Sequence, residues 1–149
     1  MTLQERLMAD LKEAMRSGDK LRQSVIRLAR ARIKNAEIAK GKPLDDADVI
    51  EVLTKEVKQR RESIAEFTKA NRQDAVSKEE AELAILLEYL PQQLSREEII
   101  AAAQQVIKEV GAQGPKDKGK VMGKLMPQLK GKAEGKVVSE VVTELLSGP

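Results

Sequence analysis

The residues of this sequence whose type and spacing suit a defined chemistry are lysines near its C-terminal end. Residues 116–136 contain seven lysines and two acids, a local net charge of +5. Lys116, Lys120 and Lys124 recur at every fourth residue, so a helix would place their ammonium groups along one stripe. Such a stripe can neutralise the phosphates of a nucleic acid backbone. We expect two further lysines just beyond it to join the same surface, Lys130 and Lys132.

Two glycines, Gly119 and Gly123, lie one helical turn apart beside the lysine stripe. A helix without side chains at these positions forms a groove that another backbone can approach closely. Both a packed neighbouring helix and an RNA backbone fit such a groove, and the sequence leaves both readings open. Phe67 and Tyr89 are the only aromatic residues, so an RNA ligand would be recognised by shape and phosphate rather than by base stacking.

A second basic stretch, residues 20–42, contains eight Lys or Arg residues and one acid. On a helix, four of these cations share one face, which is either simply solvated or binds an anion: Lys20, Arg27, Arg30 and Lys34. Arg22 and Arg32 fall on or beside the apolar face. We expect these two to be partly buried and paired with acids, for which the third helix is a candidate source.

Several kinds of active site are excluded by composition, because the chain has no cysteine and no histidine. That removes disulfides, thiolate metal sites, a cysteine nucleophile and the usual neutral-pH base. Residues 114–121 resemble a phosphate-binding loop, but Val121 stands where that loop needs a magnesium-binding hydroxyl. We interpret the acidic cluster at residues 45–48 as helix-capping rather than metal-binding. We therefore expect no catalytic residue, no metal and no cofactor.

The elements that must position these residues are helices, since strong helix formers dominate and aromatic residues make up 1% of the chain. Ser/Thr residues followed three positions later by Glu predict three helix starts, at Thr2, Ser77 and Ser95. Start and stop signals together predict an all-α, multihelical chain with helices at Thr2–Gly18, Asp19–Gly41, 45–71, Ser77–Leu90, Ser95–Gly111, about 115–126 and about 133–146.

The composition changes at Pro91, and seven of the nine glycines follow residue 110. We expect two helical subdomains, residues 1–90 and 91–149. The chain begins without the pattern of a secretory signal and has no apolar run near 20 residues. A cytoplasmic location without membrane contact is the corresponding expectation.

Three segments are similar to motifs of the GatB/YqeY family, whose stand-alone YqeY-like members the chain resembles over nearly its whole length. The segments are Glu88–Leu94 (EYLPQQL), residues 119–127 (GKVMGKLMP) and residues 130–135 (KGKAEG). The C-terminal part also resembles the tail domain of the GatB subunit of the Asp/Glu-tRNA amidotransferase. Glu134 departs from the Asp or Asn usual in the family, and Ser139 from the frequent Asn.

The resemblance implies an all-helical fold in two subdomains and an association with tRNA, with an aminoacyl-tRNA synthetase or an amidotransferase as possible protein partners. It also implies a carbon–nitrogen ligase context with glutamine as amido-N-donor, whose chemistry belongs to parts of GatB that this chain lacks. We therefore expect an accessory protein that binds tRNA or a tRNA–enzyme complex through the basic C-terminal groove. The alternatives are a tRNA-linked amidase or amidotransferase-like enzyme, and an adaptor whose groove receives a helix of another protein.

Overall fold

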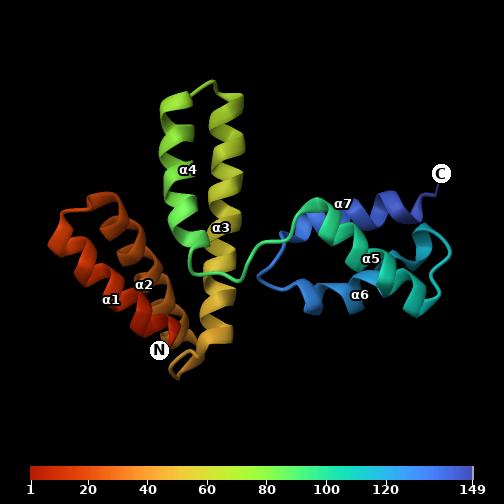
Figure 1. The fold of residues 1–149 in the computed structure, drawn as a ribbon, viewed down its shortest axis with the longest axis horizontal. Helices are drawn as coiled ribbons and strands as arrows, with labels where there is room; N and C mark the ends of the chain where they lie inside the picture. The colour runs from red at the N-terminus through yellow and green to blue at the C-terminus, as the bar shows by residue number, and fades with distance from the viewer. Residues whose placement is uncertain (149) are drawn as a thin grey trace. The chain divides into compact units, whose positions relative to one another are not determined.

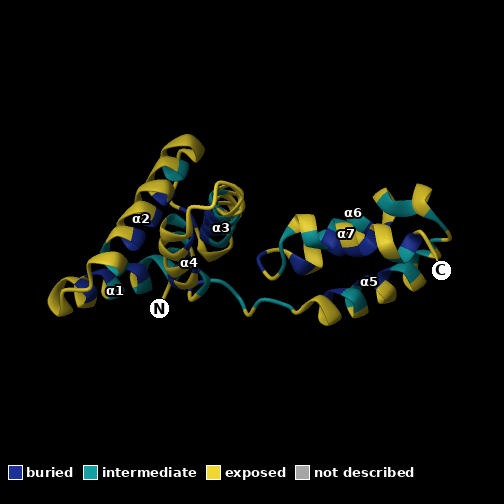
Figure 2. Ribbon diagram, turned by 90° about the horizontal axis from the view of Figure 1, so that it is seen from above, coloured by how far each residue is buried: buried dark blue, intermediate teal, exposed yellow. Residues whose placement is uncertain are grey.

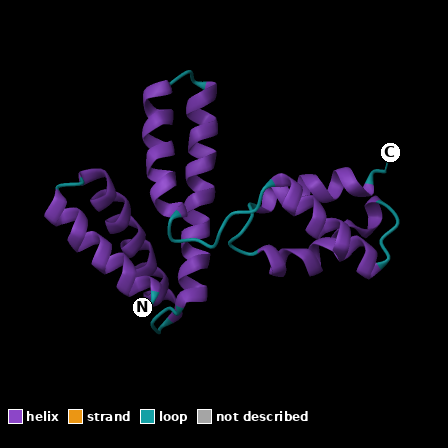
Figure 3. Cartoon of the chain, viewed as in Figure 1, coloured by secondary structure: helices purple, strands orange, loops and turns teal. Residues whose placement is uncertain are grey.

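The computed structural model describes residues 1–148, and all regular structure in that range is helical, as the sequence predicts (Figure 3). Seven α-helices and a one-turn 3-10 helix follow one another as α1 (Leu3–Ser17), α2 (Lys20–Lys40), α3 (Asp46–Lys69), α4 (Gln73–Leu87), α5 (Arg96–Val110), η1 (Pro115–Asp117), α6 (Lys118–Leu129) and α7 (Gly135–Leu146). The chain divides into two compact units, Met1–Pro91 and Gln92–Pro149. Within the described residues, no helix has both the length and the apolar character needed to cross a bilayer.

The N-terminal unit consists of two helical hairpins, α1–α2 and α3–α4 (Figure 1). The predicted capping box of Thr2 and Glu5 starts α1, and Gly18 ends it in a left-handed conformation, with φ of 77°. Apolar residues at helical spacing turn one side of each helix inward (Figure 2). Their shared core includes Leu7, Ile26, Val49, Leu53 and Leu86, each at most 2% exposed.

Ion pairs between side chains distant in the sequence also hold the N-terminal unit together. Arg60 of α3 is 8% exposed and pairs with Glu79 and Glu82 of α4. Arg32 lies 2.8 Å from Glu56 of α3, which confirms its predicted pairing with the third helix, although Arg32 itself is exposed rather than partly buried. Arg22 instead pairs with Glu88, beyond α4.

The start of α4 differs from the prediction. The helix begins at Gln73, with Arg72 as its N-cap, and Ser77 lies inside it without capping it. The cause is the short connection from α3, in which Asn71 adopts a left-handed conformation with φ of 58° and turns the chain back at once. The helix also ends early, at Leu87, because Glu88, Tyr89 and Leu90 donate their amides three residues back and tighten the last turn.

The C-terminal unit packs α5, α6 and α7 pairwise around one core. Val138 and Val142 of α7 and Val121 and Leu125 of α6 are fully buried in it. The Ser95–Glu98 capping box starts α5 as predicted. Helix α6 extends to Leu129 rather than ending near Met126 and contains Pro127 in its last turn. A proline there removes one intrahelical hydrogen bond without ending the helix.

Candidate nucleic-acid interface in the C-terminal unit

The exposed side of α6 is set by the apolar residues on its other side. Val121, Leu125 and Leu129 recur every fourth residue and are at most 4% exposed, packed against α5 and α7. This anchoring turns the rest of the helix outward, so that Gly119, Lys120, Gly123 and Lys124 are all exposed. We call this surface, together with Lys116, Lys130 and Lys132, the α6 basic face.

The two glycines of the α6 basic face do not serve close packing inside the unit. No described atom outside the local helix backbone lies within 4 Å of the position that a Cβ would take at Gly119 or Gly123. Of the two readings that the sequence left open, packing against another helix of this unit therefore lacks support. The glycines instead leave a strip of bare backbone on the surface, next to the lysines.

Pro127 removes one hydrogen bond from the last turn of α6. In an α-helix the amide of residue 127 would donate to the carbonyl of residue 123. Proline has no N–H, so the Gly123 carbonyl cannot receive that bond. The proline ring fills the place of the missing N–H, so the loss weakens the last turn of α6 and creates no open polar site.

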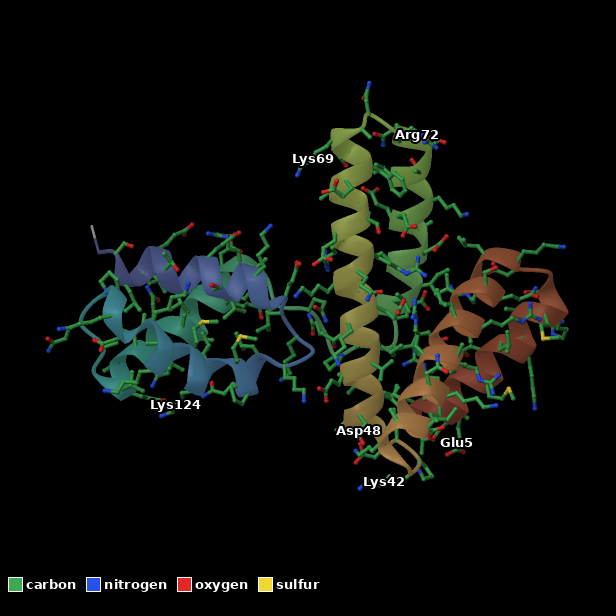
Figure 4. All side chains as sticks on the ribbon, turned by 180° about the vertical axis from the view of Figure 1, so that it is seen from behind. Glu5, Lys42, Asp48, Lys69, Arg72 and Lys124 are labelled. Carbon is green, nitrogen blue, oxygen red and sulfur yellow. The ribbon has the colours of Figure 1, made fainter. Side chains whose placement is uncertain are left out.

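The lysines predicted to form one helical stripe are divided between two elements. Lys116 belongs to η1, whereas Lys120 and Lys124 belong to α6. The three are exposed, yet their partners differ. The Lys124 ammonium lies 2.7 Å from the Glu109 carboxylate of α5 (Figure 4 labels Lys124), whereas among the described residues neither Lys116 nor Lys120 forms an ion pair.

Glu109 was not identified from the sequence. It lies on another helix, 15 positions from Lys124, and no local pattern indicates such a pair. The hydrogen bond from Lys124 lowers the pKa of Glu109, and a second bond from Gln105 acts in the same direction. Glu109 is therefore ionised at neutral pH and competes with any phosphate for Lys124.

Asp117 shapes the other end of the α6 basic face. Its carboxylate accepts the Gln113 amide at 2.9 Å, which fixes the connection between α5 and η1. This hydrogen bond lowers the pKa of Asp117, and the positive charges of Lys120 and Lys116 lower it further. The acid therefore holds the loop while leaving both lysines without an ion pair.

Lys130 and Lys132 lie beyond the opposite end of α6, in a turn that the second half of the EYLPQQL motif holds in place. The Gln93 side-chain amide donates to the Gly131 carbonyl at 2.8 Å, and the Leu94 amide donates to the Lys132 carbonyl, also at 2.8 Å. A helix of 12 residues is roughly 18 Å long. The structure thus spreads the predicted lysines along the whole of α6 instead of gathering them in one pocket.

The first half of the same motif is anchored in the N-terminal unit. Tyr89 is 3% exposed; its hydroxyl donates to Asp10, and the Arg6 guanidinium lies 4.5 Å from the centre of its ring, a cation–π contact. Arg22 forms two hydrogen bonds to Glu88, at 3.1 and 3.0 Å. Burial raises the pKa of Tyr89, and the hydrogen bond to Asp10 raises it further. Acids and bases pair with one another here, so we interpret this cluster as structural.

The other candidate sites considered in the sequence are also structural. Asp45 accepts the Asp48 amide at 2.9 Å and caps α3, while Asp48 pairs with Lys40. Within residues 1–148, no group of three or more acids is placed to hold a metal ion. The segment resembling a phosphate-binding loop connects α5 to α6, and no strand precedes it.

Sequence comparison decides the family. Residues 4–146 match the family described as Yqey-like protein. This chain is a member of that family.

Among curated proteins, the Yqey-like chain is 42% identical over 113 residues to "Altered inheritance of mitochondria protein 41, mitochondrial" of Kluyveromyces lactis, covering 73% of the chain and 60% of that protein. The namesake of Lachancea thermotolerans is 41% identical over 112 residues, with the same coverage. That of Saccharomyces cerevisiae is 40% identical over 87 residues, covering 58% of the chain and 47% of that protein.

These relatives correct one expectation. They are named as mitochondrial proteins, which contradicts the cytoplasmic location predicted from the sequence. That prediction rested on the absence of a secretory signal and of a membrane span, neither of which distinguishes the cytoplasm from an organelle interior. The Yqey-like chain spans 60% of the length of the first two relatives.

Proposed function

We propose that this Yqey-like protein is a tRNA-associated accessory protein whose C-terminal unit binds tRNA along the α6 basic face. The observation that supports this most directly is the open strip at Gly119 and Gly123, flanked by the unpaired Lys116 and Lys120. An RNA backbone needs both features, because its phosphates must meet cations while its sugars come close to the protein.

The absence of stacking aromatics on this surface favours a structured RNA read by shape over a single strand read base by base.

A phosphate contact by Lys124 has a free-energy cost, because the ammonium group must first give up, or share, its ion pair with Glu109. We therefore assign the main phosphate contacts to Lys116 and Lys120, with Lys130 and Lys132 extending the same surface beyond the helix. With about three to five contacts, log K should fall with log salt at a slope of roughly −3 to −4.5.

A helix-binding adaptor is the second candidate, favoured by the same open glycines, since small residues let two helices approach closely. The two candidates differ in their response to salt. Binding of an apolar or small-residue helix face depends weakly on ionic strength, whereas phosphate binding depends on it steeply. Amide transfer by the isolated chain is not part of the proposal.

The test is a titration of tRNA into the full chain at several salt concentrations, followed by fluorescence anisotropy. The double variant Lys116→Ala/Lys120→Ala should bind more weakly, with a slope flatter by about one unit per lost contact. Lys108→Ala is the matched control, because Lys108 is an exposed lysine of α5 on the side away from the core. Equal slopes for the wild type and the double variant would refute tRNA binding by this face.

A further inference from the structure

The N-terminal unit contains a cavity between α1 and α2 that the proposed function does not use. Its volume is about 390 Å³, within the range of about 300–1,000 Å³ typical of small-molecule sites. Leu7 and Ile33, 1% and 2% exposed, form its apolar floor. Three cations of α2 line one side: Arg27, Arg30 and Lys34.

Arg27 and Arg30 differ from most arginines of their unit because they have no acidic partner, and Lys34 beside them has none either. Among residues 1–148, none of them forms an ion pair, although residues 1–90 contain 17 acids. Six other arginines of the unit do pair with carboxylates: Arg6, Arg16, Arg22, Arg32, Arg60 and Arg72. A unit that pairs six of its arginines with acids leaves Arg27 and Arg30 without one, both beside the same cavity.

The single acid of the cavity does not neutralise them. Glu37 accepts two hydrogen bonds on one oxygen, from the Gln4 side chain at 3.1 Å and from the Leu44 amide at 2.9 Å. The Leu44 bond, and after it the Gln4 bond, lower the pKa of Glu37. Its charge is thus stabilised by α1 and by the start of the segment leading to α3, and Glu37 closes one end of the cavity.

We propose that this cavity binds a phosphate-bearing ligand of nucleotide size. Arginine guanidinium groups match phosphate oxygens with paired hydrogen bonds, and Arg27, Arg30 and Lys34 follow one another at three- and four-residue intervals on one side of α2. The apolar floor takes the less polar body of the ligand. The phosphate comes from a free nucleotide or from an RNA, and the experiment distinguishes these sources.

The cavity offers a matched pair of test variants at Ala31, an exposed helical residue of its lining. Ala31→Glu places a carboxylate among the three cations, whereas Ala31→Gln adds a side chain of nearly the same size without charge. Both Glu and Gln are good helix formers, so both variants should fold, which circular dichroism and thermal unfolding would check.

The experiment titrates inorganic pyrophosphate, ADP and tRNA separately into the full chain and follows backbone amide shifts by NMR. We expect pyrophosphate to shift amides of α1 and α2 in the wild type and in Ala31→Gln. In Ala31→Glu its affinity should fall by roughly tenfold or more, as expected for losing charge-assisted contacts. Tighter binding of ADP than of pyrophosphate identifies a nucleotide ligand. If tRNA, but not ADP, binds more tightly than pyrophosphate and shifts the α1 and α2 amides, the ligand is an RNA phosphate.

The inference fails if no probe shifts the α1 and α2 amides, or if Ala31→Glu and Ala31→Gln bind pyrophosphate equally. It is independent of the proposed function, because Lys116→Ala/Lys120→Ala leaves this cavity intact. That double variant should retain the pyrophosphate response of α1 and α2 whether or not it has lost tRNA binding.

Discussion

The carboxylate of Glu109 on α5 lies 2.7 Å from the ammonium group of Lys124 on α6, so an internal acid already holds one of the lysines assigned to RNA binding. This pair makes the α6 basic face less positive than its lysine count indicates. It also provides a variant that should increase binding rather than reduce it.

We predict that Glu109→Gln strengthens tRNA binding by a few-fold and makes the salt slope steeper by about one unit, because Lys124 becomes available to a phosphate. Gln105→Ala is a suitable control, since it removes the other hydrogen bond to Glu109 without changing charge. Anisotropy titrations of the two variants measure the difference. Weaker binding by Glu109→Gln would show that Glu109 supports the interface instead of competing with it.

Gly123→Ala should separate stability from binding. Alanine is favoured over glycine within a helix by about 0.5–1 kcal/mol, and no described neighbour obstructs a Cβ at this position. Urea unfolding should therefore show a more stable protein. Gly123→Leu should keep the fold and lower tRNA affinity by blocking close approach to the helix backbone. Unchanged affinity for the leucine variant would leave the glycine without a role in binding.

Tyr89→Phe should cost about 1 kcal/mol of stability, because it removes the hydrogen bond to Asp10 and keeps the ring beneath Arg6. The raised pKa of Tyr89 means that the folded state favours the neutral phenol. The stability that the neutral, buried phenol contributes to the folded state is complete below the unfolded-state pKa of about 10. It is lost progressively as pH rises from that value through the higher pKa of the folded state. Since Tyr89 is the only tyrosine, its absorbance reports the titration directly. Ionisation of the folded protein near pH 10 would contradict the buried contact.

Arg60→Met should destabilise the N-terminal unit by about 3–5 kcal/mol, because it leaves Glu79 and Glu82 together without their buried cation. Arg72→Met is the comparison, since Arg72 pairs with Asp74 on the surface and should change stability little. Urea unfolding of both variants measures the contrast. Similar losses for the two would mean that burial adds nothing to the α3–α4 ion pairs.

Most of the fold follows from local sequence signals, because caps and helical spacing act within a few residues. The boxes at Thr2 and Ser95 start helices as predicted. Ser77 does not, because the left-handed Asn71 reverses the chain early, and packing of α4 along α3 then outweighs a local cap.

The candidate site was less predictable than the fold, because part of it depends on contacts between helices rather than on local sequence signals. Periodicity identified the outward lysines and glycines of α6, since it depends only on which residues the helix buries. It assumed that Lys116 continues the helix, whereas Lys116 lies in η1. Glu109 and the cavity beside Arg30 depend on contacts between helices, which the spacing along one helix does not encode.

The hydrogen bonds from Gln93 and Leu94 to the turn at residues 130–134 determine where the chain can be cut to express each unit as a separate fragment. A C-terminal fragment that starts at Gln92 keeps both bonds. One that starts at Ser95, at the cap of α5, retains every helix of the unit yet releases the turn that bears Lys130 and Lys132. An N-terminal fragment likewise has to extend past Tyr89, because ending it at the last residue of α4 would expose the core that the tyrosine closes.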